Sequence, residues 1–296
     1  MTRWLVTGSA GKLGHDLVTA LAAMPAAEVA APRRRDLDIT DGEAVRGAVE
    51  GCDIVVNCAA WTDVDGAEAD ESGAFQVNAV GPANVAAACA KAGAALVQVS
   101  TDYVFAGDAS EPYRADAPVQ PVNAYGRSKA AGEAAVLEIL PDLGYIVRTA
   151  WLYGEHGPSF VASILRAAAE RETLDVVSDA TGQPTWSYPL ALQIASLGSA
   201  ALTGRARPGI YHGTASGSTT WYGLACAVFE QSGLCSHRIR PVTSENFARP
   251  ARRPAFSVLD HSSWAQAGMK PMADWRHMLT DALGRPYFAE LREGLR

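Results

Sequence analysis

The stretch that decides the fold is "RWLVTGSAGKLGHDLVTALAAM", residues 3 to 24. Its apolar start predicts a buried strand, and the later apolar spacing predicts a helix. Gly8, Gly11 and Gly14 lie at the junction between the two. Because glycine has no Cβ atom, backbone N–H groups of such a loop can approach a pyrophosphate. A plain strand-to-helix turn is the alternative, but glycines at the first strand–helix junction favour a dinucleotide site.

The same alternation of short apolar strands and helical stretches continues to about residue 175, as in "CDIVVNCAA", "ALVQVSTDYVF" and "GYIVRTAWLYG". It indicates βαβ units and a parallel sheet covered on both faces. Proline and turn signals then interrupt the pattern, for example in "SDATGQPTW". We therefore expect an α/β protein. Residues 1–150 form a Rossmann-type doubly wound parallel sheet that binds NAD(P), and residues 151–296 mainly form a smaller C-terminal α/β substrate-binding lobe, with some segments returning to the first domain.

Composition excludes several classes of protein. The net charge of −7 over 296 residues argues against a nucleic-acid partner, since phosphate contacts need a basic face. No run of about 20 apolar residues is present, and the first strand begins too early for a signal peptide. We expect a cytoplasmic protein with no membrane partner. The five cysteines show no CxxC spacing, so neither a disulfide framework nor a zinc site is indicated.

The end of the second strand, "PRRRD" at residues 32 to 36, bears on cofactor choice. NAD sites usually carry an acidic residue there, which holds the ribose hydroxyls. Arg33 and Arg34 would instead suit a 2′-phosphate, which favours NADPH, with NADH possible. The alternative is a solvated basic turn.

Tyr125 and Lys129 in "NAYGRSKAAGE", residues 123 to 133, are the candidate catalytic pair. Residues four apart share a helix face, so both can enter one cleft. Only four of the 25 basic residues are lysine, because the chain uses arginine for most of its positive charge. A lysine at position 129 therefore indicates that its side chain has a specific role. Lowering a tyrosine pKa from about 10 to about 7 takes about 4 kcal/mol, which an ammonium about 4 Å away can supply. We expect Tyr125 to transfer a proton and Lys129 to tune it.

A third catalytic group should be a hydroxyl at the end of the fourth strand, where Ser100 and Thr101 stand. Strand alternation sends one of the two side chains into the cleft. We favour Thr101 as the group that orients a substrate carbonyl beside Tyr125. The alternative is a strand-end turn residue without a catalytic role.

These motifs, in this order, together with "NCAAWTDVDGAE", "VRTAWLYG", "GQPTW" and "RPAFSVLD", resemble the dTDP-4-dehydrorhamnose reductase family and related deoxysugar 4-ketoreductases. That family belongs to the extended short-chain dehydrogenase/reductase superfamily. The resemblance implies NAD(P)H-dependent reduction of the C4 ketone of a dTDP-4-keto-6-deoxyhexose, with dTDP-4-dehydro-L-rhamnose going to dTDP-L-rhamnose. It also implies that Tyr125 protonates the ketone oxygen, Lys129 holds the ribose and Thr101 hydrogen-bonds the carbonyl.

The resemblance extends to the binding residues. Those expected at the cofactor, besides Arg33, Arg34, Tyr125 and Lys129, are Gly8, Gly11, Lys12, Leu13, Gly14, Asp38, Ile39, Ala59, Ala60, Trp61 and Thr62. Those expected at the dTDP-linked ketosugar are Thr62, Val64, Thr101, Asp102, Tyr125, Trp151, Arg252 and Arg253. The two arginines are the natural partners of the diphosphate, because a guanidinium grips phosphate in a bidentate way. A solvated basic loop is the alternative for them, and a core aromatic is the alternative for Trp151.

One departure concerns metal binding. Some relatives hold magnesium at a dimer interface through glutamates near the glycine helix and after the "PT" motif. This chain has Asp16 at the first place, but "WSYPLAL" at the second contains no acid. We therefore expect no metal ion, and either a monomer or a homodimer.

Three other functions stay open. One is a related reductase of specialised metabolism, similar to dTDP-dihydrostreptose synthase. Another is a nucleotide-sugar dehydratase or epimerase, although dehydratases typically carry Glu after the Thr-Asp pair, where this chain has Tyr103. The last is a non-catalytic NADP-binding subunit, similar to the regulatory subunits of methionine adenosyltransferase. Such subunits tend to lose the Tyr or the Lys, and this chain keeps both.

Overall fold

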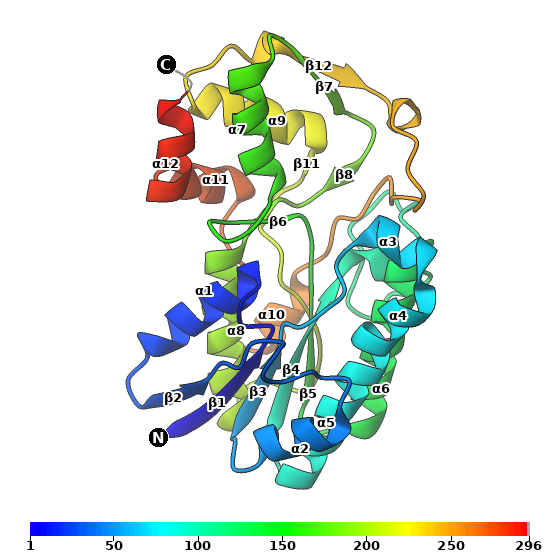
Figure 1. Ribbon diagram of the computed structural model, residues 1–296, viewed down its shortest axis with the longest axis vertical. Helices are drawn as coiled ribbons and strands as arrows, with labels where there is room; N and C mark the ends of the chain where they lie inside the picture. Colours follow the sequence, from blue (N-terminus) through cyan, green and yellow to red (C-terminus); the bar gives the residue numbers. More distant parts are fainter. Residues whose placement is uncertain (295–296) are drawn as a thin grey trace.

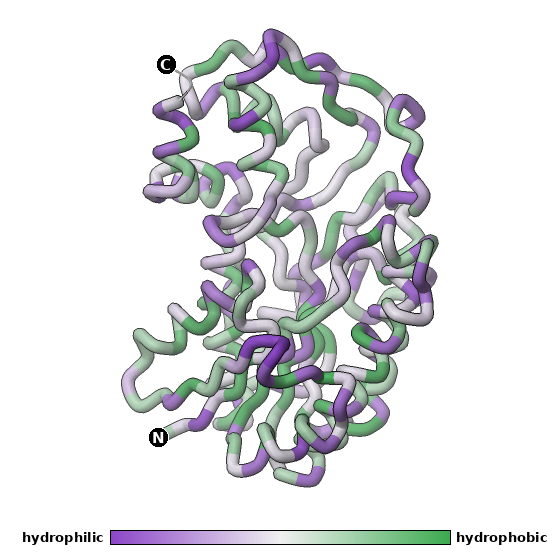
Figure 2. Tube along the Cα trace, in the orientation of Figure 1, coloured by the Kyte–Doolittle hydropathy of each residue, from purple (hydrophilic) through white to green (hydrophobic). Residues whose placement is uncertain are grey.

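A six-stranded parallel sheet forms the larger lobe of the computed structural model, which describes residues 1–294 (Figure 1). The strands lie in the order β2-β1-β3-β4-β5-β10. Their bounds are β1 (Thr2–Thr7), β2 (Ala27–Ala30), β3 (Ile54–Asn57), β4 (Ala95–Thr101), β5 (Gly144–Thr149) and β10 (Gly209–His212). Every residue of β3 and β5 is buried, and the central strands run mostly through hydrophobic residues (Figure 2). This is typical of a parallel sheet with both faces covered, and it confirms the predicted α/β fold.

Helices cover both faces of this sheet (Figure 1). On one face α1 packs against α8, and on the other α5 packs against α2 and α6. Their bounds are α1 (Lys12–Ala22), α2 (Gly42–Val49), α5 (Gly81–Ala92), α6 (Ala124–Ile139) and α8 (Ser187–Leu202). Helix α8 lies close to β1, since a Cβ atom on Gly198 would come within 2.5 Å of the Trp4 ring. Both α8 and β10 come from the C-terminal half of the chain, yet they complete the larger lobe.

Between β3 and α5 the chain runs through α3 (Val64–Ala69), α4 (Glu71–Phe75) and a π-helical turn at Gln76–Val80. Asp63 and Asp70 begin the two short helices by accepting hydrogen bonds from the backbone N–H groups of Gly66 and Gly73. This segment packs against α6, the helix that carries the predicted catalytic pair.

The smaller lobe consists of helices and very short strands (Figure 1). Its helices are α7 (Phe160–Glu170), α9 (Trp221–Gln231), α11 (Trp275–Leu283) and α12 (Pro286–Glu293), while the five-residue α10 (Ser262–Gln266) lies beside β10. Its strands are β6 (Leu152–Tyr153), β7 (Leu174–Val177), β8 (Thr181–Gly182), β9 (Thr185–Trp186), β11 (Thr219–Thr220) and β12 (Ile239–Val242). They pair two by two, as β6 with β9, β7 with β12 and β8 with β11.

The strand order reverses direction between β1 and β3, because β2 lies on one side of β1 and β3 on the other. Such a switch point is where open α/β sheets bind ligands, at the carboxyl ends of the strands. Buried polar side chains link these ends: Thr7 donates to Asn57, whose Nδ2 donates to Gln98 Oε1 at 2.7 Å. Across residues 1–294 no helix has the length and apolar character needed to cross a membrane.

Candidate active site

A cavity of about 780 Å³ opens at the carboxyl ends of the strands and is bordered by both lobes. From the larger lobe it is lined by the glycine loop, the segment after β2, the end of β3, the end of β4 and the first turns of α6. The predicted site residues among its lining are Gly8, Gly11, Lys12, Leu13, Gly14, Arg34, Asp38, Ile39, Ala59, Ala60, Thr62, Val64, Thr101, Asp102, Tyr125, Lys129 and Trp151.

The glycine loop fits the diphosphate of a dinucleotide. A Cβ atom on Gly8, whose φ is +65°, would come within 2.5 Å of the Ala59 backbone nitrogen. One on Gly14 would come within 2.2 Å of the Gly8 carbonyl oxygen. Helix α1 starts at Lys12 without a side-chain cap from Gly11 and without an acidic residue in its first turn. Its first N–H groups and the positive end of its dipole are therefore available to an anionic ligand.

The predicted adenosine end of the cavity separates the two candidate arginines. Arg34, Asp38 and Ile39 line the cavity, whereas Arg33 lies outside its lining. The backbone N–H and hydroxyl of Thr40 hydrogen-bond to Asp38 and lower the pKa of its carboxyl group. Of the two arginines, only Arg34 borders the cavity.

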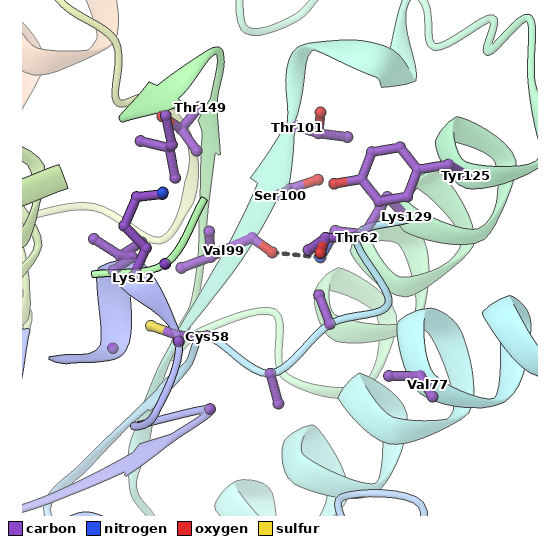
Figure 3. A pocket seen from close by; sticks show the side chains of 18 of the residues that line it. Lys12, Cys58, Thr62, Val77, Val99, Ser100, Thr101, Tyr125, Lys129 and Thr149 are labelled. Carbon is purple, nitrogen blue, oxygen red and sulfur yellow. Dashed lines mark hydrogen bonds between the residues drawn. The ribbon is translucent and has the colours of Figure 1, made fainter. Parts of the chain in front are cut away.

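The predicted catalytic residues come together at the other end, where β4 meets α6 (Figure 3). Asn123 caps α6 by accepting from the Gly126 N–H at 2.8 Å, which fixes Tyr125 in the first turn of the helix. Lys129 lies one turn later, is buried, and donates from Nζ to the Val99 carbonyl oxygen at 2.7 Å. Burial lowers the pKa of Lys129 to about 8.

The pKa of Tyr125 differs from the sequence expectation. Burial raises it to about 12, against a smaller opposing effect from the nearby Thr101 side chain. The Lys129 ammonium is held by the Val99 carbonyl, and the phenol lies near the Asp102 carboxylate, which also raises its pKa. Tyr125 is therefore protonated at neutral pH, which is the state that a proton donor requires.

Ser100 and Thr101 both line the cavity, although strand alternation predicted that one of them would (Figure 3). The reason is local, because β4 ends at Thr101 and the chain turns into a 3₁₀ helix at Asp102–Val104. Thr101 donates to Asp102 Oδ1 at 3.0 Å. The Ser100 hydroxyl is buried and has no hydrogen-bond partner within the described part of the chain.

Asp102 is a second buried polar group of the cavity. Burial raises the pKa of its carboxyl group to about 6, and its Oδ2 atom has no hydrogen-bond partner among residues 1–294. Buried polar atoms are rarely left unpaired. The side chains of Ser257 and Thr101 oppose the effect of burial on this carboxyl group, and Asp102 borders the cavity.

Three other predicted residues lie outside the cavity lining. The Trp61 indole donates to the Asp63 carbonyl oxygen at 2.9 Å. Arg252 is exposed, and its carbonyl oxygen accepts from Asn123. Arg253 forms an ion pair with Asp65 through N–O distances of 2.8 and 2.9 Å, and this lowers the pKa of Asp65. The charge of Arg253 is therefore already compensated within the chain.

The cavity also contains residues that the sequence analysis did not identify. Thr149 ends β5 beside Thr101, so the strand-end rule that found Thr101 could have found it. Cys58 and Val77 carry no comparable signal. Trp221 enters from the smaller lobe at the start of α9, and nothing in its local sequence links it to Trp151.

His15, Asp16 and His156 form a further polar cluster, in which the possible ligand atoms lie within 4.8 Å of one another. The two imidazole rings are tilted by 31° with centroids 3.5 Å apart, and Asp16 Oδ1 is 3.7 Å from His156 Nε2. The Ser187 hydroxyl donates to Asp16 Oδ2. Only Asp16 was apparent from the sequence, because the histidines are far apart along the chain. The expectation that no metal ion binds stays a prediction.

Comparison with known proteins places this geometry in context. The family described as "RmlD substrate binding domain" matches residues 2–287. A dTDP-4-dehydrorhamnose reductase of Streptomyces griseus is 54% identical over 282 residues, covering 95% of this chain and 92% of its own. A dTDP-4-keto-6-deoxy-D-glucose reductase of Streptomyces niveus is 48% identical, covering 95% and 96%. The crystal structure of dTDP-4-dehydrorhamnose reductase from Bacillus anthracis in complex with NADP superimposes with a TM-score of 0.88 at 35% identity, covering 96% and 99%.

Proposed function

Since the chain belongs to the RmlD substrate binding domain family, we propose that it is an NADPH-dependent reductase of dTDP-4-keto-6-deoxyhexoses. It reduces the C4 ketone, with dTDP-4-dehydro-L-rhamnose going to dTDP-L-rhamnose. One observation carries the proposal: a hydroxyl, a protonated phenol and a buried lysine line the same cavity as a glycine loop that fits a dinucleotide. We place the reaction in the cytoplasm.

The mechanism assigns each side chain a role at the ketone. Bound NADPH supplies the hydride that the C4 carbon accepts. Tyr125, which lines the cavity and is protonated at neutral pH, donates its phenolic proton to the ketone oxygen. Thr101, which lines the cavity together with Tyr125, orients the same oxygen. Asp102, which borders the cavity, accepts a hydrogen bond from a sugar hydroxyl.

Lys129 contributes a positive charge next to the reacting groups. Its ammonium is anchored at Val99 and retains further donor hydrogens for a ribose hydroxyl. An ammonium at this place also stabilises the phenolate that Tyr125 becomes after it gives up its proton.

Arg34 supports NADPH as the cofactor in preference to NADH. It lines the cavity beside Asp38, where the 2′-phosphate of the adenosine ribose would lie. The relative from Bacillus anthracis binds NADP, which agrees with this choice.

We assign the substrate diphosphate to the segment that carries Arg252 and Arg253. Burial raises the pKa of Tyr103, which lines the cavity, and the nearby charge of Arg253 opposes that shift. A phosphate group would replace Asp65 as the partner of Arg253, and arginine can hold either anion in a bidentate way.

The test is an NADPH-consumption assay with a panel of dTDP-4-keto-6-deoxyhexoses, followed by NMR of each product. The panel includes dTDP-4-keto-6-deoxy-D-glucose, because the relative from Streptomyces niveus is named for that substrate. We expect NADPH consumption and a new hydroxyl group at C4. A product that retains the C4 ketone would identify a dehydratase or epimerase. NADPH binding without consumption on any sugar would identify a binding protein.

A further inference from the structure

Two indole rings from different lobes form one wall of the cavity. Trp151 follows the end of β5, and Trp221 is the first residue of α9 in the smaller lobe. Their ring centroids lie 3.6 Å apart with an interplanar angle of 10°, and both residues line the cavity. The two rings are therefore stacked nearly in parallel where the lobes meet.

One short ladder of the smaller lobe holds this pair of rings. β8 and β11 pair antiparallel, with Gly182 opposite Thr219. A Cβ atom on Gly182 would come within 2.5 Å of Trp151 Cε2, so the Gly182 backbone lies directly against the indole. At the end of β11, Thr220 caps α9 by accepting from the Gly223 N–H at 3.0 Å, which fixes Trp221. The same ladder thus positions Trp221 and the glycine that supports Trp151.

The backbone of Trp151 shows that this position is imposed by its surroundings. Its φ angle is +47°, in the left-handed region that non-glycine residues avoid. Such a conformation costs on the order of 1–3 kcal/mol and persists only where the surrounding structure requires it. The Trp151 carbonyl oxygen accepts a hydrogen bond from the Thr185 N–H in the smaller lobe. Both rings are partly buried and pack against the edge of the main hydrophobic cluster, while one side of the pair borders the cavity.

We propose that Trp221 is a substrate-specificity residue that acts with Trp151 on the 6-deoxyhexose group. This inference rests on the proposed function. The two indoles, with Phe160 packed against Trp221 at 4.7 Å between centroids, give the cavity an apolar wall. A deoxysugar presents an apolar C6 methyl group, which can pack on such a wall without losing a hydrogen bond. A C6 hydroxyl would be desolvated there without a partner.

The experiment compares Trp221→Ala with Trp221→Phe in steady-state kinetics. We expect Trp221→Ala to raise KM for the ketosugar about 10- to 100-fold with a smaller change in kcat, since a buried aromatic contact to the ligand is lost. Trp221→Phe should restore most of the affinity. The Kd for NADPH should stay unchanged in both variants, which a general structural defect would not allow.

Phe160→Leu is the matched control, because Phe160 packs on Trp221 but lies outside the cavity lining. It should leave KM within about threefold of wild type, given the small energy of one tilted aromatic contact. Gly182→Ala should reproduce the KM increase, since the added methyl group displaces Trp151. If Trp221→Ala does not fold, Trp221→Leu removes the aromatic ring while keeping apolar volume.

A calorimetric titration with dTDP-L-rhamnose and with dTDP alone completes the test. Wild type should bind the sugar nucleotide more tightly than dTDP, and the Ala or Leu variant should lose that difference. An active wild type with unchanged KM and unchanged discrimination in the variant would overturn the role of Trp221. A wild type that reduces no ketosugar would instead overturn the proposed function.

Discussion

The two walls of the cavity are built in different ways. The wall from the larger lobe includes the buried Thr101, Asp102 and Lys129 and the partly buried Tyr125, placed at a strand end and in the first turns of a helix. The wall from the smaller lobe consists of an aromatic ring held by two-residue strands. Burial shifts the pKa values of Asp102, Tyr125 and Lys129 on the first wall. The comparison suggests that proton transfer uses rigid elements, whereas recognition of the sugar uses connecting segments.

The largest expected effect tests the chemical role of the first wall. Tyr125→Phe should lower kcat by roughly 10²- to 10⁴-fold, because the ketone oxygen loses its proton donor. The Kd for NADPH should stay nearly unchanged, which a fluorescence titration can measure. Turnover close to that of wild type would mean that the wall from the larger lobe does not supply the proton through Tyr125.

Lys129→Arg should lower kcat by about 10²-fold, because the larger guanidinium does not fit the buried space beside Val99, and a shift of about 1 Å can cost that much. If positive charge alone were needed, the variant would keep most of its activity. Lys129→Met, measured beside it, gives the rate without any charge.

The same methionine variant tests the cost of burying the charge. The folded pKa of Lys129, about 8, lies below its ordinary value of 10.5, so its contribution to stability is lost as pH falls from about 10.5 to about 8. At pH 7 we therefore expect Lys129→Met to have a Tm at least as high as that of wild type. A large drop in Tm would show that the ammonium stabilises the fold, which contradicts this account.

Arg34→Ala should weaken NADPH binding about 10- to 100-fold and leave NADH binding almost unchanged, because only the 2′-phosphate loses a partner. Arg33→Ala is the matched control, since Arg33 lies outside the cavity lining. Equal losses for the two cofactors, or equal effects of the two substitutions, would refute the assignment to Arg34.

The smallest expected effect concerns Asp102. Its folded pKa, about 6, lies above its ordinary value of 3.8, so stability is present below about pH 4 and is lost as pH rises to about 6. Asp102→Asn should remove this loss and raise the free energy of unfolding above pH 6 by on the order of 1 kcal/mol. Urea denaturation between pH 4 and pH 8 measures it. A variant that is less stable at pH 7 would show that the carboxylate is not desolvated at a net cost.

Sequence patterns predicted the first wall better than the second. Strand ends, the glycine loop and the four-residue spacing of Tyr125 and Lys129 are local features, and the larger lobe places them where regular geometry dictates. The alternation rule failed at Ser100 and Thr101, where the strand ends. The sequence analysis predicted that the pKa of Tyr125 is lowered, and this was wrong, because burial in the folded protein raises it.

The second wall carries little local signal. Trp221 stacks on Trp151 only because a two-residue ladder, invisible as a pattern, brings α9 to the end of β5. The ion pair between Arg253 and Asp65 likewise joins distant segments. The sequence also did not show that Arg34 lines the cavity and Arg33 does not. That difference depends on the conformation of the turn after β2, which composition does not specify.

The central claim is that this cavity delivers a hydride and a proton to the two atoms of one ketone. The most direct measurement is reduction of dTDP-4-dehydro-L-rhamnose with NADPH deuterated at nicotinamide C4 on the transferred face, followed by NMR of the sugar. The account predicts one deuterium at C4 of dTDP-L-rhamnose in the wild type and almost none in Tyr125→Phe over the same time. A product that retains its C4 ketone, or carries deuterium at another carbon, would contradict it.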